Sequence, residues 1–419
     1  MVEKSRQQTG KNKIGKFKLG SLWPFKKKKV TGTVVRYSTN VDRVFLALVI
    51  IMVCLGTIMI ASASYANSYE YHGEDSYFFI KKQLMMAAIG LAAMIAMIRF
   101  ADYIMLEKIS VVFFALIVIV NYLTAFFGAL KNGARRWIDI PVINMSVQPS
   151  EFLKLAVIMI FAYCISKKTD EMKKPKWGIG VSLLIAACAG ISMLLQKHIS
   201  GLIIVGVLCV AMMMIGDAPG WFLGILGAAA ASGWIALEKN IEPIVEFLSK
   251  TPIAHVGQRL AVWKDPYIDQ RGDGHQIIQS LYAIGSGGWT GLGLGQSKQK
   301  FLYLPEPQND YIFAIICEEL GYIGAILIIL AFVMLIWRGA CIAHQAPNKF
   351  SSCLVMGITI KTALQVILNI AVVTNVLPAT GITLPFFSYG GTALIILMAE
   401  MGIILSVSKY SHKRPEGER

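Results

Sequence analysis

Long apolar stretches, separated by short polar segments, form the main pattern along this chain. About ten runs of roughly 17 to 25 residues match the length needed to cross a hydrocarbon core of about 30 Å. They begin near Val44, Gln83, Ile109, Glu151, Gly178, Ile199, Gly220, Asp310, Phe350 and Tyr389. The pattern predicts an all-α polytopic membrane protein with about ten transmembrane helices.

The composition agrees with this prediction. Of the 419 residues, 55% are hydrophobic and only 16% are charged, and the mean hydropathy is +0.59. This profile favours a multi-pass membrane protein over a soluble enzyme. The seven cysteines fall mostly in apolar runs and form no CxxC pair, so we expect neither a disulfide framework nor a zinc site. No cleavable signal precedes the first span, which is expected to direct insertion itself.

The distribution of Lys and Arg predicts the topology. Basic residues gather in residues 1–43, in residues 167–176 and after Ser408, and the positive-inside rule places all three in the cytoplasm. We therefore divide the chain into a basic, disordered arm (1–43), a transmembrane domain (44–409) and a cytoplasmic tail (410–419). The arm either binds anionic lipid or a cytoplasmic partner, or serves only to orient the first span; we favour the last.

The same topology places residues 69–75, 131–151, 239–309 and 377–391 on the outer face. The stretch 239–309, between spans 7 and 8, mixes amphipathic pieces with a glycine-rich run, and we expect a reentrant or interfacial segment. Lys131, Arg135 and Arg136 break the charge rule, because cations are disfavoured outside. Either an anionic headgroup compensates for them, or they are an ordinary exception to a statistical bias.

Ionisable residues within the predicted spans need a partner or a task, because burying a charge in a membrane is costly. They are Glu151, Lys154, Glu318, Glu319, Lys361 and Glu400. The i, i+3 spacing lets Glu151 and Lys154 neutralise each other on one helix face. Glu318, Lys361 and Glu400 fall at similar depth and can meet near the midplane. A structural ion network is the favoured interpretation, and a proton or ion relay is the alternative.

The segment "PEPQND" places carboxylates at the outer mouth of the eighth span. Pro305 and Pro307 stop any helix before it, so Asn309 or Asp310 is the expected cap of that span. Glu306 lies nearby, and a neighbouring carboxylate raises the proton affinity of Asp310. A carboxylate in this state can act as a general base towards a hydroxyl group.

Three segments together resemble one known family. "QSLYAIGSGGWTGLGLGQSKQKFLYLPEPQNDYIFAIICEELGYIG" (279–324), "LNIAVVTNVLPATGITLPFFSYGGTA" (368–393) and "GARRWI…QPSEFLKL" (133–155) are similar to the SEDS family of shape, elongation, division and sporulation proteins. The wording "TGITLPFFSYGG" favours its FtsW- and SpoVE-like branch over its RodA-like branch. The resemblance covers the whole membrane part of the chain.

This resemblance implies a peptidoglycan glycosyltransferase that polymerises lipid II at the outer face of the bacterial cytoplasmic membrane, in cell division or sporulation. It implies inverting transfer, with Asp310 as the catalytic residue and undecaprenyl pyrophosphate as the leaving group. The expected partners are a class B penicillin-binding protein, nascent lipid-linked glycan and other divisome membrane proteins, with no nucleic acid. Candidate substrate-binding residues are Arg135, Arg136, Arg259, Gln296, Lys300 and Glu306. A divalent cation, Mg or Mn, is a further candidate for neutralising the pyrophosphate.

Two departures from the family pattern limit the transfer of roles. Gln308 and Asn309 stand where the family often has a His-Thr pair, and His198 stands where an acid is usual. We expect His198 to be a polar lining or structural residue. Two rival functions stay open at this point. One is a lipid II flippase that uses the charges in the spans, and the other is a non-catalytic divisome scaffold in which Asp310 is dispensable.

Overall fold

The computed structural model describes residues 40–71, 75–131, 133–140, 145–251 and 254–410. All of them belong to one compact unit, Tyr37–Arg419. The predicted basic arm, apart from residues 40–43, and the predicted tail after Tyr410 lie outside the described residues. The subdivision of the chain into arm, membrane domain and tail therefore stays a prediction.

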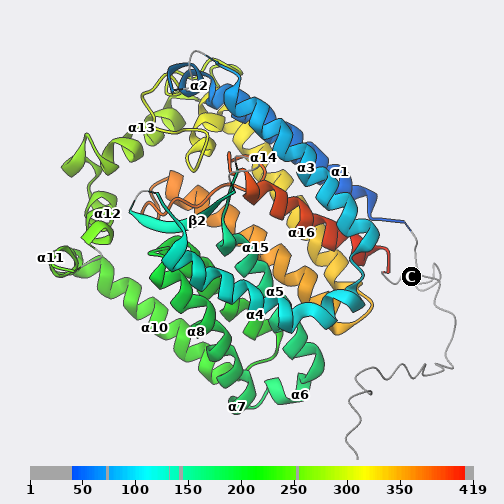
Figure 1. The fold of residues 1–419 in the computed structure, drawn as a ribbon. Coiled ribbons are helices and arrows are strands. Elements are labelled where there is room, and N and C mark those ends of the chain that lie inside the picture. The colour runs from blue at the N-terminus through cyan, green and yellow to red at the C-terminus, as the bar shows by residue number, and fades with distance from the viewer. Residues whose placement is uncertain (1–39, 72–74, 132, 141–144, 252–253, 411–419) are drawn as a thin grey trace, which may run out of the picture. The chain divides into compact units, whose positions relative to one another are not determined.

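Helices account for most of the described fold, as expected (Figure 1). Among the described residues, eight helical segments are long and apolar enough to cross a membrane, and two shorter apolar helices accompany them. The long segments are α1 (Arg43–Ala63), α3 (Phe78–Phe100), α4 (Tyr103–Phe127), α5 (Pro149–Lys167), α7 with α8 (Pro175–Gly178 and Gly180–Leu195), α10 (Gly220–Lys239), α14 (Ile312–His344) and α15 (Lys349–Val373). The shorter ones are α9 (Ile199–Ile215) and α16 (Thr392–Ser408). The number of spans and the sidedness of the termini stay predictions.

Two helices begin earlier than the apolar pattern indicates. α3 begins at Phe78 rather than near Gln83, and α4 begins at Tyr103 rather than near Ile109. Their first two turns carry pairs of charged residues, such as Lys81 and Lys82, which interrupt an apolar run but do not break a helix. Both helices therefore include the charged residues that precede the apolar run.

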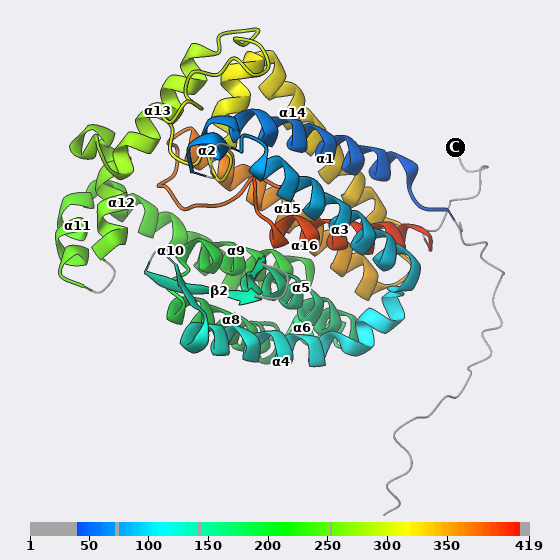
Figure 2. The same ribbon diagram turned by 45° about the horizontal axis from the view of Figure 1, so that its top comes forward.

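Helices with similar mean hydropathy differ in how much of their surface is buried inside the protein. In the most apolar window of α5, 72% of residues are buried inside the protein, compared with 61% in α15 and none in α10. Figures 1 and 2 show α5 and α15 in the middle of the helices, whereas α10 lies at the edge. α10 therefore offers most of its surface to lipid or to a ligand, although Phe222 and Leu223 pack against the core.

The outer segment 131–151 contains a small sheet that the sequence pattern did not reveal. Strands β1 (Ala129–Lys131), β2 (Ala134–Ile140) and β3 (Met145–Val147) are antiparallel, with β2 in the centre. Neighbouring residues on a strand point to opposite faces. As a result Arg136 lines a cavity, while the exposed Arg135 donates to the carbonyl of Phe126 at 2.5 Å. The strands thus decide which of the two arginines is available to a ligand.

The long outer stretch is built from short helices. They are α11 (Ile241–Ser249), α12 (Ala254–Lys264), a 3₁₀ turn (Pro266–Asp269) and α13 (Asp273–Ser286). The remaining short helices are α2 (Tyr65–Tyr71), after α1, and α6 (Thr169–Met172), after α5. The glycine-rich run follows α13 and leads to Asp310.

α14 is interrupted at Gly321, where φ is 67° and ψ is −171°. A break in a membrane helix frees backbone groups, and each of them needs a partner because the bilayer core offers no water. The glycine-rich run supplies partners on both sides of the break. The bonds run from Leu292 N to Glu318 O (2.9 Å), Gly293 N to Glu319 O (3.0 Å), Tyr322 N to Gly288 O (2.9 Å) and Ile323 N to Trp289 O (3.2 Å).

Replacing Gly321 by alanine tests this junction. The new Cβ would lie 2.2 Å from Gly291 N, and the backbone would hold a non-glycine residue in the left-handed region. We expect Gly321→Ala to destabilise the protein by at least about 1–3 kcal/mol. Thermal unfolding in detergent measures the effect. Gly206→Ala in α9, where a Cβ meets no atom within 4 Å, is the control. Equal melting temperatures for both variants would contradict the account.

Candidate active site

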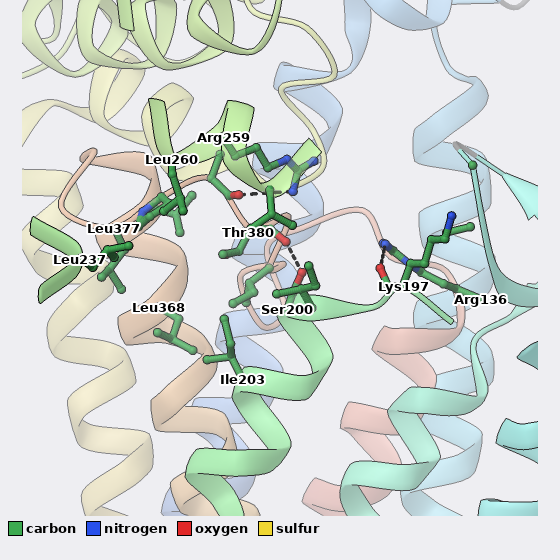
Figure 3. A pocket seen from close by; sticks show the side chains of 18 of the residues that line it. Arg136, Lys197, Ser200, Ile203, Leu237, Arg259, Leu260, Leu368, Leu377 and Thr380 are labelled. Atoms are coloured by element: carbon green, nitrogen blue, oxygen red, sulfur yellow. Dashed lines mark hydrogen bonds between the residues drawn. The ribbon is translucent and has the colours of Figure 1, made fainter. Parts of the chain in front are cut away.

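Two adjoining cavities lie at the end of the bundle that carries the sheet and the helix α12. The first, which we call the apolar cavity, has a volume of about 860 Å³. Figure 3 shows Ile203 of α9, Leu237 of α10, Leu260 of α12 and Leu368 of α15 around it. A long hydrocarbon chain can occupy such a space, because apolar side chains from four helices form its walls.

The second cavity, which we call the polar cavity, has a volume of about 590 Å³. Carboxylates and cations line it side by side with glycines of the "SYGG" turn. The acidic, basic and histidine members are Lys82, Arg136, Glu151, Lys154, His198, Arg259, Glu306 and Asp310. Both cavities share Arg136, Ser200, Arg259, Thr380 and Ile382, so the two spaces adjoin along one rim.

Asp310 lies in the polar cavity and not at a helix cap. The cap residue of α14 is Tyr311, which makes no side-chain capping bond, so the prediction that Asn309 or Asp310 caps this helix is wrong. The backbone of Asp310 is held instead by Asn369 of α15. Its amide donates at 2.7 Å to the carbonyl of Asp310 and at 2.7 Å to that of Ile382. The carboxylate is thereby left free for the cavity.

The environment of Asp310 favours its protonated form. Burial raises the pKa of Asp310 to about 6, and the neighbouring Glu306 carboxylate adds to the rise. The backbone N–H of Asp310 and the charge of Arg259 oppose it. A carboxyl group with a pKa close to the working pH is both present as a base and strong enough to take a proton.

Arg136 and Arg259 point towards the shared rim without a carboxylate partner in the described part of the chain. Arg136 donates to the carbonyls of Gln196 (3.5 Å) and Lys197, and Arg259 donates to that of Ala379 (3.3 Å) (Figure 3). Burial, and then the charge of Arg259, lower the pKa of Arg136. Two guanidinium groups fixed by carbonyls are suited to an anion such as a pyrophosphate.

Gln308 and Asn309, which stand where the family often has a His-Thr pair, hold the loop before Asp310 in place. Gln308 is buried, and its side-chain oxygen accepts a bond of 3.0 Å from Asn67 of α2. Its carbonyl accepts a bond of 2.8 Å from Tyr389 N. Asn309 donates to the carboxylate of Glu306 at 2.7 Å. Both amides therefore position the loop, and neither can exchange protons as a histidine does.

His198 lies at the edge of the polar cavity. Burial, together with the charge of Arg136, lowers its pKa to about 3, so the imidazole is neutral at physiological pH. Its Nδ1 is buried without a hydrogen-bond partner in the described structure. A neutral ring at the wall of the cavity fits the expected role of a lining residue better than that of a base.

The charges inside the spans form separate pairs. Glu151 and Lys154 make the ion pair that their spacing indicated, at 2.7 Å. Lys361 and Glu400 pair at 2.5 Å between α15 and α16. Glu318 does not join them, because its carboxylate accepts from Ser297 Oγ (2.5 Å) and from the backbone N–H of Lys298 (3.0 Å). The expected meeting of Glu318 with Lys361 and Glu400 is therefore not found.

Lys300 is the clearest departure from the predicted substrate-binding set. Its ammonium group is buried, pairs with Glu319 at 3.0 Å, and donates to Gly295 O (2.5 Å) and Ser62 Oγ (3.1 Å). Among the predicted residues, Lys300, Gln296 and Arg135 line neither cavity, whereas Arg136, Arg259, Glu306 and Asp310 do. Lys300 fixes the loop because its charge is already satisfied inside the protein.

The candidate divalent cation has no dedicated cluster among the described residues. No group of three or more His, Cys, Asp or Glu side chains there is arranged to hold a metal ion. The polar cavity offers the carboxylates of Glu306 and Asp310 as oxygen ligands. Mg and Mn often bind through few protein oxygens together with substrate phosphates, so a divalent cation stays a candidate.

Two side chains at the site were missed by sequence reasoning. Asn369 lies within a predicted span, where a polar residue is a signal of function or packing. Lys82 lies in α3, but just before the start of the predicted second span. The search for charges passed over Asn369 because an amide is neutral. It passed over Lys82 because the predicted second span began after it, near Gln83.

Lys300→Met distinguishes a structural lysine from a substrate-binding one. Removing the ammonium leaves Glu319 buried without its cation, and we expect a loss of about 3–5 kcal/mol in the free energy of unfolding. Lys298→Met is the matched control, since Lys298 is exposed and contributes only its backbone N–H to Glu318. Thermal unfolding of the two purified variants measures the difference. A stable Lys300→Met protein with weakened substrate binding would restore the original assignment.

Comparisons with known proteins identify the family. A family model described as "Cell cycle protein" (FtsW, RodA and SpoVE) matches residues 42–413. Stage V sporulation protein E of Bacillus subtilis is 40% identical over 378 residues, which cover 89% of this chain and 98% of that protein. The probable peptidoglycan glycosyltransferase FtsW of Geobacter sp. is 37% identical over 373 residues, which cover 88% and 96%.

Solved structures share the fold. A chain from a peptidoglycan synthase complex, described as coordinating polymerization and crosslinking, has a TM-score of 0.70 at 23% identity, covering 88% of this chain and 97% of that one. RodA of Thermus thermophilus has a TM-score of 0.64 at 21% identity, covering 89% and 98%. The predicted fold class and the predicted likeness to FtsW and SpoVE are confirmed. The chain belongs to the FtsW/RodA/SpoVE family of multi-pass membrane proteins.

Proposed function

We propose that this protein is a peptidoglycan glycosyltransferase that polymerises lipid II at the outer face of the cytoplasmic membrane. The observation that carries the proposal is the position of Asp310. Its carboxyl group, with a pKa of about 6, lies in a cavity whose rim bears two guanidinium groups and adjoins a large apolar cavity. Curated relatives named as peptidoglycan glycosyltransferases support the same activity.

The chemical step needs one base and one place for departing charge. Asp310 accepts the proton of the 4-hydroxyl group of the acceptor lipid II as that oxygen attacks the anomeric carbon of the growing chain. The new glycosidic bond forms while the bond to the pyrophosphate breaks, and the anomeric configuration inverts. The undecaprenyl pyrophosphate leaves with the electron pair, and Asp310 afterwards releases its proton to water.

Arg136 and Arg259 receive the negative charge that develops on the leaving pyrophosphate. They are held by backbone carbonyls before the reaction, so little reorganisation accompanies charge development. The apolar cavity begins at the same two side chains, which suits a headgroup attached to a polyprenyl tail. Glu306 tunes Asp310 by its charge, and a divalent cation bound with the pyrophosphate would add to the positive charge.

The expected partner is a class B penicillin-binding protein that crosslinks the new glycan. Support comes from the structural neighbour that belongs to a peptidoglycan synthase complex, which coordinates polymerization with crosslinking. The sequence relatives FtsW and stage V sporulation protein E point to a role in cell division or sporulation. Other divisome membrane proteins are further expected partners in that role.

The competing functions receive less support from the site. Glu151 pairs with Lys154 and Lys361 pairs with Glu400, so packing of the helices accounts for these four charges. A scaffold would not require a carboxylate with a raised pKa in one cavity with two guanidinium groups that have no carboxylate partner among the described residues. The observations therefore favour the enzyme.

Asp310→Asn tests the proposed function. The amide keeps the size of the side chain but cannot take a proton, and we expect polymerisation of lipid II to fall by at least about 10²–10⁴-fold. Gel-resolved glycan length measures the product, with the purified protein and its penicillin-binding partner in one membrane. Asp217→Asn, in the exposed turn before α10, is the control.

Normal polymerisation by a folded, partner-bound Asp310→Asn protein would show that another group is the base. A translocation assay on the same variant then separates the flippase from the scaffold. Movement of lipid II that survives in Asp310→Asn but is lost in Lys361→Met would identify a transporter.

The pH profile of polymerisation gives a second test. Asp310 must be ionised to act as a base, so the rate falls about tenfold per pH unit below its pKa and levels off above it. The raised pKa places this acid limb near pH 6. Glu306→Gln removes a negative charge that raises the pKa, so we expect the limb to move to lower pH. Glu242→Gln on α11 is the control, and a limb at the same pH in both variants would contradict the assignment.

A further inference from the structure

Lys82 is a cation of the polar cavity that the proposed chemistry leaves unused. It lies in the second turn of α3 and lines the polar cavity, but not the apolar cavity. Its Nζ lies 4.3 Å from the ring centre of Phe78, and no carboxylate of the described residues pairs with it. Its neighbour Lys81 is different, because it forms an exposed ion pair of 2.9 Å with Asp75.

A lysine that faces a cavity and is not paired with a carboxylate is available to an anion from outside the protein. We propose that Lys82 binds the pyrophosphate of a second lipid-linked substrate, the acceptor, on the α3 side of the polar cavity. This inference rests on the proposed function, and it adds a binding site to it. Lys82 holds the acceptor and does not take part in bond breaking.

The reaction itself requires two anionic headgroups. Donor and acceptor each carry a pyrophosphate and a polyprenyl tail, so two separate paths from the bilayer are needed. The apolar cavity lies among α9, α10, α12 and α15. Lys82, Met85 and Met86 line the polar cavity from α3. Figures 1 and 2 show α3 and α10 on opposite sides of α15, so the two approaches are distinct.

The chemistry assigns the two sides. Only the donor pyrophosphate gains charge in the reaction, so it needs the stronger and more rigid site, which Arg136 and Arg259 provide. The acceptor keeps its pyrophosphate bond, and a single ammonium group is enough to hold it. Asp310 lines the polar cavity that reaches both sides, as a base for the acceptor hydroxyl must.

The surface beside Lys82 is suited to a lipid tail. Leu84 and Met85 are 55% and 45% exposed, and both follow Lys82 on α3. Met86 is buried and lines the cavity. Methionine side chains adapt to irregular apolar groups, so a tail can reach the bilayer along this helix while its headgroup stays at the ammonium.

An anionic phospholipid headgroup has the same phosphate chemistry and is the alternative occupant. The two sources differ in their effect, because a phospholipid at Lys82 would compete with lipid II and would not be counted as substrate. Binding must therefore be measured with each lipid separately.

The test counts lipid II molecules bound to the full chain in nanodiscs of phosphatidylcholine. The Asp310→Asn background prevents turnover, and native mass spectrometry reports the number bound. We expect two lipid II molecules with Asp310→Asn alone and with added Lys81→Met, but one with added Lys82→Met. Lys82→Arg keeps the charge and should restore the second molecule. Lys82→Gln replaces Lys82→Met if the latter does not fold.

Kinetics on active protein give an independent measure. Loss of a charged hydrogen bond to the acceptor should raise the half-saturating lipid II concentration by about tenfold in Lys82→Met, with the rate at saturation little changed. Lys81→Met should behave like the wild type.

Equal occupancy and equal kinetics in Lys82→Met and Lys81→Met would overturn the acceptor site. A Lys82-dependent gain of phosphatidylglycerol, with two lipid II molecules retained, would overturn it in favour of a phospholipid site. Failure of the proposed function has a different signature, since Asp310→Asn would then polymerise lipid II normally whatever Lys82 binds.

Discussion

The fold around the site depends on the backbone exchange between the broken helix α14 and the glycine-rich run. Unpaired N–H and C=O groups are not tolerated in a bilayer, so the break at Gly321 exists only because residues 288–293 pair with it. The same loop continues to Asp310 through Leu302 and Glu306, which both have positive φ. Such strain persists only where neighbours hold the chain, as the buried pair of Lys300 and Glu319 does here.

Whether a charged residue of this protein has a structural or a chemical role depends on whether it is paired with an opposite charge. Among the described residues, several acids and lysines of the spans are held in ion pairs, such as Lys361 with Glu400. The polar cavity is different, because Arg136, Arg259 and Lys82 line it without a carboxylate partner. Unpaired cations in a partly dry cavity are costly unless an anion arrives, which connects the cavity to a phosphate-bearing ligand.

Sequence reasoning was strong where one-dimensional patterns carry the information. Apolar runs predicted the helices, and the i, i+3 spacing predicted the pair of Glu151 and Lys154. It could not predict features that depend on the direction in which a side chain points. Lys300 and Arg136 are both cations of the outer segments, yet one is buried in an ion pair and the other lines a cavity. No spacing rule distinguishes them, because the loop geometry and the pleat of a strand set their directions.

The proposed chemistry depends on a site inside the helix bundle, because burial changes the proton affinity of Asp310. The pKa of Asp310 rises because its carboxyl group is buried, and backbone carbonyls hold the guanidinium groups of Arg136 and Arg259 at the rim beside it. A substrate with a polyprenyl tail brings its headgroup to this depth without leaving the bilayer. The apolar cavity and the α3 side of the polar cavity therefore serve a common end, since each lets a lipid deliver a pyrophosphate to a place where fixed charges act at full strength.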